Sequence, residues 1–420
     1  MMVHKKKFFS VCLIILCCVI LSVYAFVPRD TSRLRAYPYP YRSMLSIQSH
    51  IDGTTPEEFE EVHRYLNGKE NTIYGDGLGL DIGDSLWVYN ANNGAQYREY
   101  DKSPVEDYMT WFNGTDTTTE NDAEMIAKYW EMGWIDSIHS FGDFSRTDGQ
   151  ALCDRSLAQA AWDAMLAKGV APKVWINHGL PTNRQNFGGY TPITSTKYQA
   201  GDDPNSAYYH TDISMANGMK FVWNSRNCSM LGVENPLYLT RMRDGRLIWC
   251  FNAYTGYTSE AGFQYQWTPY QLHNILTKEN LDKLVADGSY SIIANHFGSG
   301  DLWEILGEHN LPAFRLLRDY HKAGEIMVVR SSRLLEYAAV RECLRYRTKS
   351  NSVDVIAVDD PVVGSYVPQP QDLHGITFYV EDSDTAALTI CGNTVDESFV
   401  VRNPADETGR ESIGFFWYEK

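Results

Sequence analysis

Histidine and aspartate residues recur directly after predicted strands. These residues are the candidates for a catalytic or metal-binding site. The segments are Ser-His-Ile-Asp-Gly at 49–53, His-Ser-Phe-Gly-Asp at 139–143, Asn-His-Gly at 177–179 and Asn-His-Phe-Gly at 295–298. Imidazole and carboxylate groups bind zinc and other divalent ions, and they also act as general acids and bases. If these segments meet in the fold, they predict a metal-dependent hydrolytic site.

Taken singly, each of these residues also has a purely structural interpretation. Asp52 precedes Gly53 and Asp143 follows Gly142, and aspartate beside glycine is common in turns. A histidine at the end of one strand is often only a hydrogen-bonded structural residue. The common placement of all four segments favours a site, because active sites of parallel barrels form at the carboxyl ends of the strands.

The elements that must position these residues alternate between strands and helices. We expect strands at 44–48, 135–139, 173–177, 219–223, 247–253, 291–295 and 326–329, and helices at 56–66, 156–168, 280–286 and 332–346. Such alternation predicts a parallel sheet built from βαβ units. Seven or eight units between residues 44 and 348 favour an α/β fold of the distorted (β/α)7 barrel type, and no dinucleotide or P-loop motif favours an open sheet.

The last part of the chain, 349–420, has a different pattern. Short β-rich runs at 353–358, 376–380, 386–390 and 398–401 are separated by proline, glycine, aspartate and asparagine. These runs predict a small β-rich accessory region, either a sandwich or a sheet packed on the barrel.

The N-terminus predicts export. A basic stub at 1–7 precedes an unbroken apolar stretch at 8–27, which is long enough to cross a bilayer as a helix. This stretch is either a transmembrane anchor or a signal peptide cleaved after Ala25. We therefore expect residues 28–43 to be a spacer and the rest of the chain to be extracytoplasmic, either membrane-anchored or secreted.

Composition narrows the possible partners. The formal net charge is −16, which argues against a nucleic-acid partner because phosphate backbones require basic surfaces. Aromatic residues make up 13% of the chain, which suits carbohydrate binding as well as ordinary cores. The five cysteines after the apolar stretch lack metal-site spacing and leave disulfides open.

Taken together, the segments resemble the polysaccharide deacetylase (NodB-homology) family. Residues 49–53 resemble its T-F-D-D-G motif, residues 139–143 resemble its H-x-x-x-H motif as an H-x-x-x-D variant, and residues 292–296 resemble its late strand ending in L-x-H. The resemblance covers about 44–340, more by the order of elements than by identity. It implies a distorted (β/α)7 barrel, a divalent metal, with zinc as the first expectation, and a polysaccharide or oligosaccharide substrate.

The resemblance also implies a role for each matching residue. Asp52, His139 and Asp143 would hold the metal, and His296 would protonate the leaving amine. Ile51 stands where the family has its catalytic base, so the base would be His178 or Asp81, although Asp81 also fits a hairpin turn. His50 is expected to point to the opposite strand face.

Two further residues are candidates for substrate contact. Arg184 is the arginine nearest to the position of the family's R-x-P motif. Trp223 could contact a sugar, with a place in the core as the alternative that its apolar neighbours favour.

The sequence thus predicts a metal-dependent carbohydrate deacetylase-like hydrolase that acts outside the cytoplasm. The alternative is a catalytically impaired relative that binds glycan during polysaccharide biosynthesis or export, because an isoleucine cannot accept a proton. A third possibility, a glycoside hydrolase, would need two carboxylates facing each other across a cleft.

Overall fold

The computed structural model describes most of the chain. The described residues are 33–90, 96–97, 104–105, 107–144, 152–179, 183–188, 200–232, 236–299 and 302–418. The expected membrane segment at 8–27 and its basic stub lie outside these residues. None of the described helices is both long and apolar enough to cross a membrane.

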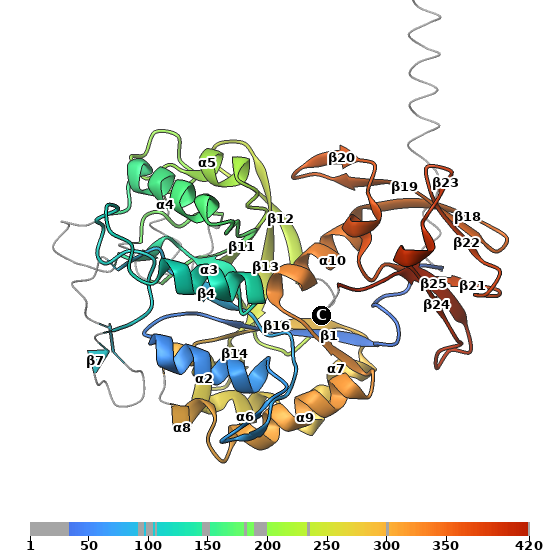
Figure 1. Ribbon diagram of the computed structural model, residues 1–420, viewed down its shortest axis with the longest axis horizontal. Coiled ribbons are helices and arrows are strands. Elements are labelled where there is room, and N and C mark those ends of the chain that lie inside the picture. The colour runs from blue at the N-terminus through green and yellow to red at the C-terminus, as the bar shows by residue number, and fades with distance from the viewer. Residues whose placement is uncertain are drawn as a thin grey trace, which may run out of the picture.

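A curled parallel sheet forms the centre of a mixed α/β fold (Figure 1). Its strands, in spatial order, are β17 (Ile326–Val328), β1 (Ser43–Ser49), β16 (Tyr290–Asn295), β13 (Leu247–Tyr254), β11 (Phe221–Cys228), β10 (Val174–Ile176), β8 (Ile135–His139) and β4 (Asp84–Leu86). Strand β12 (Leu237–Arg241) pairs antiparallel with β13. An isolated parallel bridge joins Gln48 of β1 to Gly83, so the chain just before β4 returns to β1.

Side chains alternate between the two faces of this sheet, as the pleat of a strand requires. On β16, Ile292 and Ala294 belong to the core cluster inside the curl, whereas Ile293 packs toward the helices outside. Because both faces are buried, strands such as β10, β13 and β17 are almost continuously apolar, which made them predictable.

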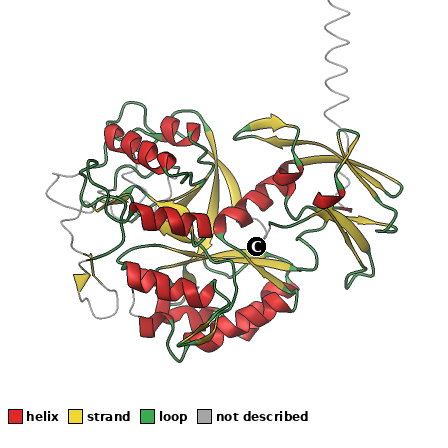
Figure 2. Ribbon diagram, viewed as in Figure 1, coloured by secondary structure: helices red, strands yellow, loops and turns green. Residues whose placement is uncertain are grey.

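Helices cover the outer face of the sheet (Figure 2). They are α2 (Pro56–Leu66), α3 (Ala123–Met132), α4 (Arg155–Ala167), α5 (Thr211–Ala216), α6 (Leu272–Ile275), α7 (Lys278–Ala286), α8 (Leu302–Ile305) and α9 (Asn310–Lys322), with short 3-10 turns η3 (Pro269–Gln271) and η4 (Phe297–Ser299). Helix α10 (Ser331–Cys343) instead packs in the inner cluster with Ile292 and Ala294. The predicted helix at 56–66 is confirmed at both ends. Thr55 and Glu58 form a capping box at its start, which satisfies backbone N–H groups that have no partner within the helix.

Two predictions for the barrel region are wrong. Strand β4 belongs to the main sheet, where the sequence suggested a hairpin turn, because a three-residue strand next to Gly83 is too short to show a pattern. The helix expected at 332–346 ends at Cys343, and the chain continues directly into strand β18.

Four strand pairs of the described residues form small sheets separate from the main sheet. They are β2 (Asn71–Thr72) with β3 (Gly75–Asp76), β5 (Tyr89–Asn90) with β9 (Gly142–Asp143), β6 (Gln96–Tyr97) with β7 (Pro104–Val105), and β14 (Gly256–Ser259) with β15 (Gly262–Tyr265).

The β-rich pattern predicted after residue 349 is confirmed as two small sheets. One contains β18 (Leu344–Lys349), β19 (Ser352–Asp360), β20 (Gly364–Tyr366), β22 (Ala387–Ile390) and β23 (Asn393–Thr394), and the other contains β21 (Thr377–Val380), β24 (Val400–Asn403) and β25 (Glu411–Phe415), with turns η5 (Pro370–Leu373) and η6 (Glu397–Phe399) between strands. Helix α10 lies between these sheets and the main sheet (Figure 1). All five cysteines of the described residues are free.

Candidate metal centre

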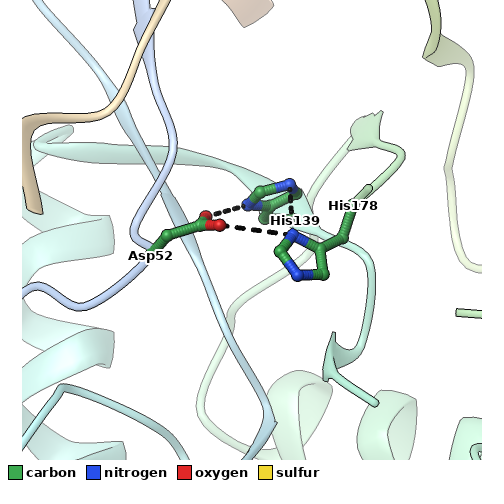
Figure 3. Close-up of side chains that lie close together, drawn as sticks. All are labelled: Asp52, His139 and His178. Atoms are coloured by element: carbon green, nitrogen blue, oxygen red, sulfur yellow. Dashed lines mark hydrogen bonds and ion pairs between the residues drawn. The ribbon is translucent and has the colours of Figure 1, made fainter. Parts of the chain in front are cut away.

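Three of the predicted segments bring their side chains together beyond the carboxyl ends of β1, β8 and β10. The Nδ1 atom of His139 lies 2.7 Å from Oδ1 of Asp52, and the Nδ1 atom of His178 lies 3.3 Å from Oδ2 of Asp52. The two histidines approach each other within 3.3 Å. Figure 3 shows the three side chains converging from separate segments.

Two more histidines complete this group. The Nδ1 atom of His50 lies 3.1 Å from Nε2 of His296, and the His50 ring lies 4.6 Å from that of His139. We call Asp52, His139, His178, His50 and His296 the carboxyl-end cluster. As expected, His50 and Ile51 point in opposite directions, but the cluster lies on the side of His50, whereas Ile51 is buried in the apolar core.

The loop after β8 holds two of these histidines in place. Ser140 adopts a positive φ of 50°, which turns the chain sharply after His139. The Ser140 hydroxyl accepts a hydrogen bond from the backbone N–H of His178 and donates one to Asn186. One serine therefore fixes the relative position of the β8 and β10 loops.

Asp143 supports the cluster from behind. It lies on the two-residue strand β9, which pairs with β5, and its Oδ1 atom lies 3.4 Å from Nε2 of His178. The pairing requires glycine at position 142, where φ is 139° and a Cβ atom would lie 2.0 Å from the carbonyl oxygen of Tyr89. Asp143 thus orients His178 from the side opposite Asp52.

The charges in the cluster are strongly coupled. Burial disfavours ionisation of Asp52, but His139 and His178 nevertheless hold its pKa well below the usual value. Burial also opposes protonation of His178, yet Asp52 and Asp143 raise its pKa to about 9. For His50, burial and the imidazoles of His296 and His139 keep the pKa well below its usual value. The carboxylates therefore attract positive charge to one side of the cluster.

Asp52, His139 and His178 could hold a metal ion, since one ligand atom from each lies within 4.8 Å of the others. Two atoms at this point, Oδ1 of Asp52 and Nδ1 of His139, are buried without a hydrogen-bond partner of suitable geometry, although they lie 2.7 Å apart. Buried polar atoms are rarely left unpaired. One carboxylate and two imidazoles are also a donor set that zinc accepts, so the residues fit a divalent ion.

This set differs from the predicted one in a single member. His178, expected as a base, takes the place that the sequence gave to Asp143, which lies behind it instead. The H-x-x-x-D spacing places Asp143 on the next short strand, and so it reaches only the far side of the His178 ring.

Tryptophan rings enclose the histidines. Trp87 lies 5.4 Å from His178, Trp223 lies 5.2 Å from His50, and Trp267 lies 4.5 Å from His296. Trp223 lies near the cluster but is 8% exposed and belongs to the apolar core, the alternative that its neighbours favoured. Sequence reasoning missed Trp87, which follows the short strand β4, and Trp267, which follows the unpredicted strand β15.

Two other predicted site residues are not brought to the cluster. Asp81 precedes β4 at the opposite end of the sheet, where it forms ion pairs with Arg330 and Arg333, and it cannot serve as the base. Arg184 is exposed, and its guanidinium lies over the Tyr208 ring at 6.0 Å.

Comparisons of the chain with protein-family models, with curated proteins and with solved structures give no match.

Proposed function

We propose that the protein is a metal-dependent hydrolase of the polysaccharide deacetylase type, which removes acyl groups from carbohydrate outside the cytoplasm. The observation that carries this proposal is the convergence of Asp52, His139 and His178 at the carboxyl ends of parallel strands. In this proposal, the curled sheet of eight parallel strands is a variant of the family's distorted (β/α)7 barrel, and zinc is the preferred ion.

A bound divalent ion would polarise the acyl carbonyl and lower the pKa of a water molecule. Asp52, His139 and His178 would hold the ion, and Asp143 would fix the orientation of the His178 ring. His296 would donate a proton to the leaving group, and His50, whose Nδ1 atom lies 3.1 Å from Nε2 of His296, would orient the His296 ring. Trp87 and Trp223 would exclude bulk water.

A carbohydrate substrate is supported by aromatic side chains around the same end of the sheet. The β14–β15 hairpin follows the carboxyl end of β13, and its Tyr265 is 54% exposed. Trp267, two residues further on, contacts His296. Exposed aromatic faces that lead to a polar site suit the C–H faces of sugar rings.

A specific observation also favours the non-catalytic alternative. Ile51 is fully buried in an apolar cluster, so no carboxylate stands where the family has its base. The glycosidase alternative is less well supported, because the His178 ring lies between Asp52 and Asp143 and contacts both carboxylates.

Elemental analysis of the purified protein tests the metal site first. We expect one divalent ion per chain, lost in His139→Ala but retained in His309→Ala, which removes an exposed histidine. Absence of metal after reconstitution with zinc, nickel, cobalt or manganese would contradict the proposal. Acetate release from acetylated glycans then separates the hydrolase from a metal-binding but inactive relative.

A further inference from the structure

A cavity of about 460 Å³ opens at the amino ends of the main-sheet strands, away from the carboxyl-end cluster. Met44 and Tyr290, near the starts of β1 and β16, contribute to its lining, together with residues of β12, β13 and α10. Its volume falls within the range of pockets that hold small molecules, roughly 300–1,000 Å³. No step of the proposed hydrolysis uses this cavity.

Aromatic rings form much of the cavity wall, and the polar ends of three of them are bound to the protein itself. The Tyr37 hydroxyl donates to the carbonyl of Gly288, and the Tyr337 hydroxyl donates to that of Ala36. The indole N–H of Trp249 donates to a carboxylate oxygen at 3.1 Å. With their polar atoms occupied, these residues offer ring faces to a ligand, in orientations that are already fixed.

One cation, Arg341, and one exposed carboxylate, Glu342, lie at this wall. Arg341 donates from Nε to the backbone carbonyl of Arg35, and within the described part of the chain it forms no ion pair with a carboxylate. Burial raises the pKa values of Tyr37, Tyr290 and Tyr337, and the positive charge of Arg341 opposes that rise at all three. The guanidinium therefore acts electrostatically on the aromatic wall.

The inner end of the cavity is lined by buried apolar residues, and its opening to solvent is lined by more exposed residues that include Arg341. Met44 and Leu334 are almost fully buried, whereas Leu239 is 41% exposed and Arg341 is half-buried. A ligand that fits this gradient has a ring body and a negatively charged end. The planar fork of arginine matches a carboxylate with two parallel hydrogen bonds.

We propose that this cavity is a second binding site, which takes a small ring-bearing carboxylate. The ring packs against Tyr37, Trp249 and Tyr337, and the carboxylate binds Arg341. An aryl carboxylate and a uronic acid share this chemistry. The site lies at the other end of the strands from the metal centre, so it does not depend on the proposed hydrolase activity.

Isothermal titration of the full chain with 2-naphthoate and with glucuronate tests the site, with 2-naphthamide and glucose as uncharged counterparts. We expect saturable binding of at least one carboxylate, and the responding one identifies the ring type. Arg341→Gln should weaken that binding about tenfold or more, because it removes a charge-assisted hydrogen bond. Leu239→Trp should also weaken it by filling the mouth, and at an exposed position it should leave the fold intact.

Carboxylate binding in this cavity should not depend on the metal centre. His139→Ala should bind the carboxylate as the wild type does, even after losing its metal. The proposal is overturned if neither carboxylate binds, or if binding is unchanged in both Arg341→Gln and Leu239→Trp. Equal binding of the uncharged counterparts would also overturn it.

Discussion

An aspartate lies at each end of the main sheet, fully buried at the amino end and 17% exposed at the carboxyl end, and the two carboxylates have different surroundings. At the amino end, Asp360 of β19 accepts hydrogen bonds from the Trp249 indole and the Val362 backbone, and its second oxygen lies 2.7 Å from the ammonium of Lys220. At the carboxyl end, Asp52 faces two histidines, with its Oδ1 atom 2.7 Å from Nδ1 of His139 and its Oδ2 atom 3.3 Å from Nδ1 of His178.

The difference separates a structural ion pair from a ligand site. The Oδ2 atom of Asp360 faces a lysine ammonium, which cannot bind a metal ion, so this group ties the C-terminal sheets to β11 and β13 and is not a ligand site. Asp52 instead faces two imidazoles, which are metal ligands, and one ligand atom from each of the three residues lies within 4.8 Å of the others. Substitutions at the two ends should therefore affect different properties.

The largest effect on stability is expected from Asp360→Ala. It would leave Lys220 buried without its counter-charge, which costs about 3–5 kcal/mol of unfolding free energy for a buried pair. Urea denaturation would measure this loss, and bound metal should be unchanged in the folded fraction. Asp359→Ala is the matched control. The Asp359 carboxylate is next in the chain to Asp360, but it is 36% exposed and pairs with Arg345 at the surface. Equal losses in the two variants would contradict a special role for Asp360.

Asp143→Asn should produce the opposite result. The substitution keeps the shape of the side chain but removes the charge behind His178, and loss of such a supporting contact typically weakens metal affinity about 10–100-fold. Competition with a chelator would measure the change, with Asp163→Asn on the outer helix α4 as control. If Asp143→Asn lowered stability but left metal affinity unchanged, the carboxyl end would be structural as well.

The same contrast explains what the sequence could predict. Short strands and capped helices have local sequence patterns, so strand β8 and helix α2 were predicted with their correct bounds. The parallel strand order also predicted that the four segments with histidine and aspartate would lie at the carboxyl edge of the sheet. The choice between His178 and Asp143 as metal ligand depends on the turn at Ser140, and the Lys220–Asp360 pair joins residues far apart in the chain. Neither has a local sequence signal.

A smaller, pH-dependent effect is expected where Arg35 binds Asp406 near the C-terminal sheets. Despite burial, hydrogen bonds from Thr408 and Tyr379 and the charge of Arg35 lower the Asp406 pKa to about 2. This contribution is present above the unfolded pKa of roughly 4 and is lost as the pH falls toward 2. Asp406→Asn should be less stable than the wild type in urea at pH 7, and the difference should shrink by pH 3. A constant difference would show that charge is not the cause.

The smallest effect is expected at the rim of the metal centre, and it tests the carbohydrate part of the proposal. Tyr265 lies on the hairpin face that continues to Trp267 and His296, whereas Tyr257 pairs with Gln264 on the other face. Tyr265→Ala should raise KM for a polymeric acylated glycan about two- to tenfold, the worth of one aromatic contact, and leave kcat unchanged.

Tyr257→Ala is the matched control, because it removes a tyrosine of similar exposure, 43% against 54%, from the same two strands. If both substitutions raised KM equally, the hairpin would act through its overall fold and not through one ring face. If neither substitution raised KM, the glycan would not contact the hairpin. The carboxyl-end cluster would then act on a substrate too small to reach the hairpin.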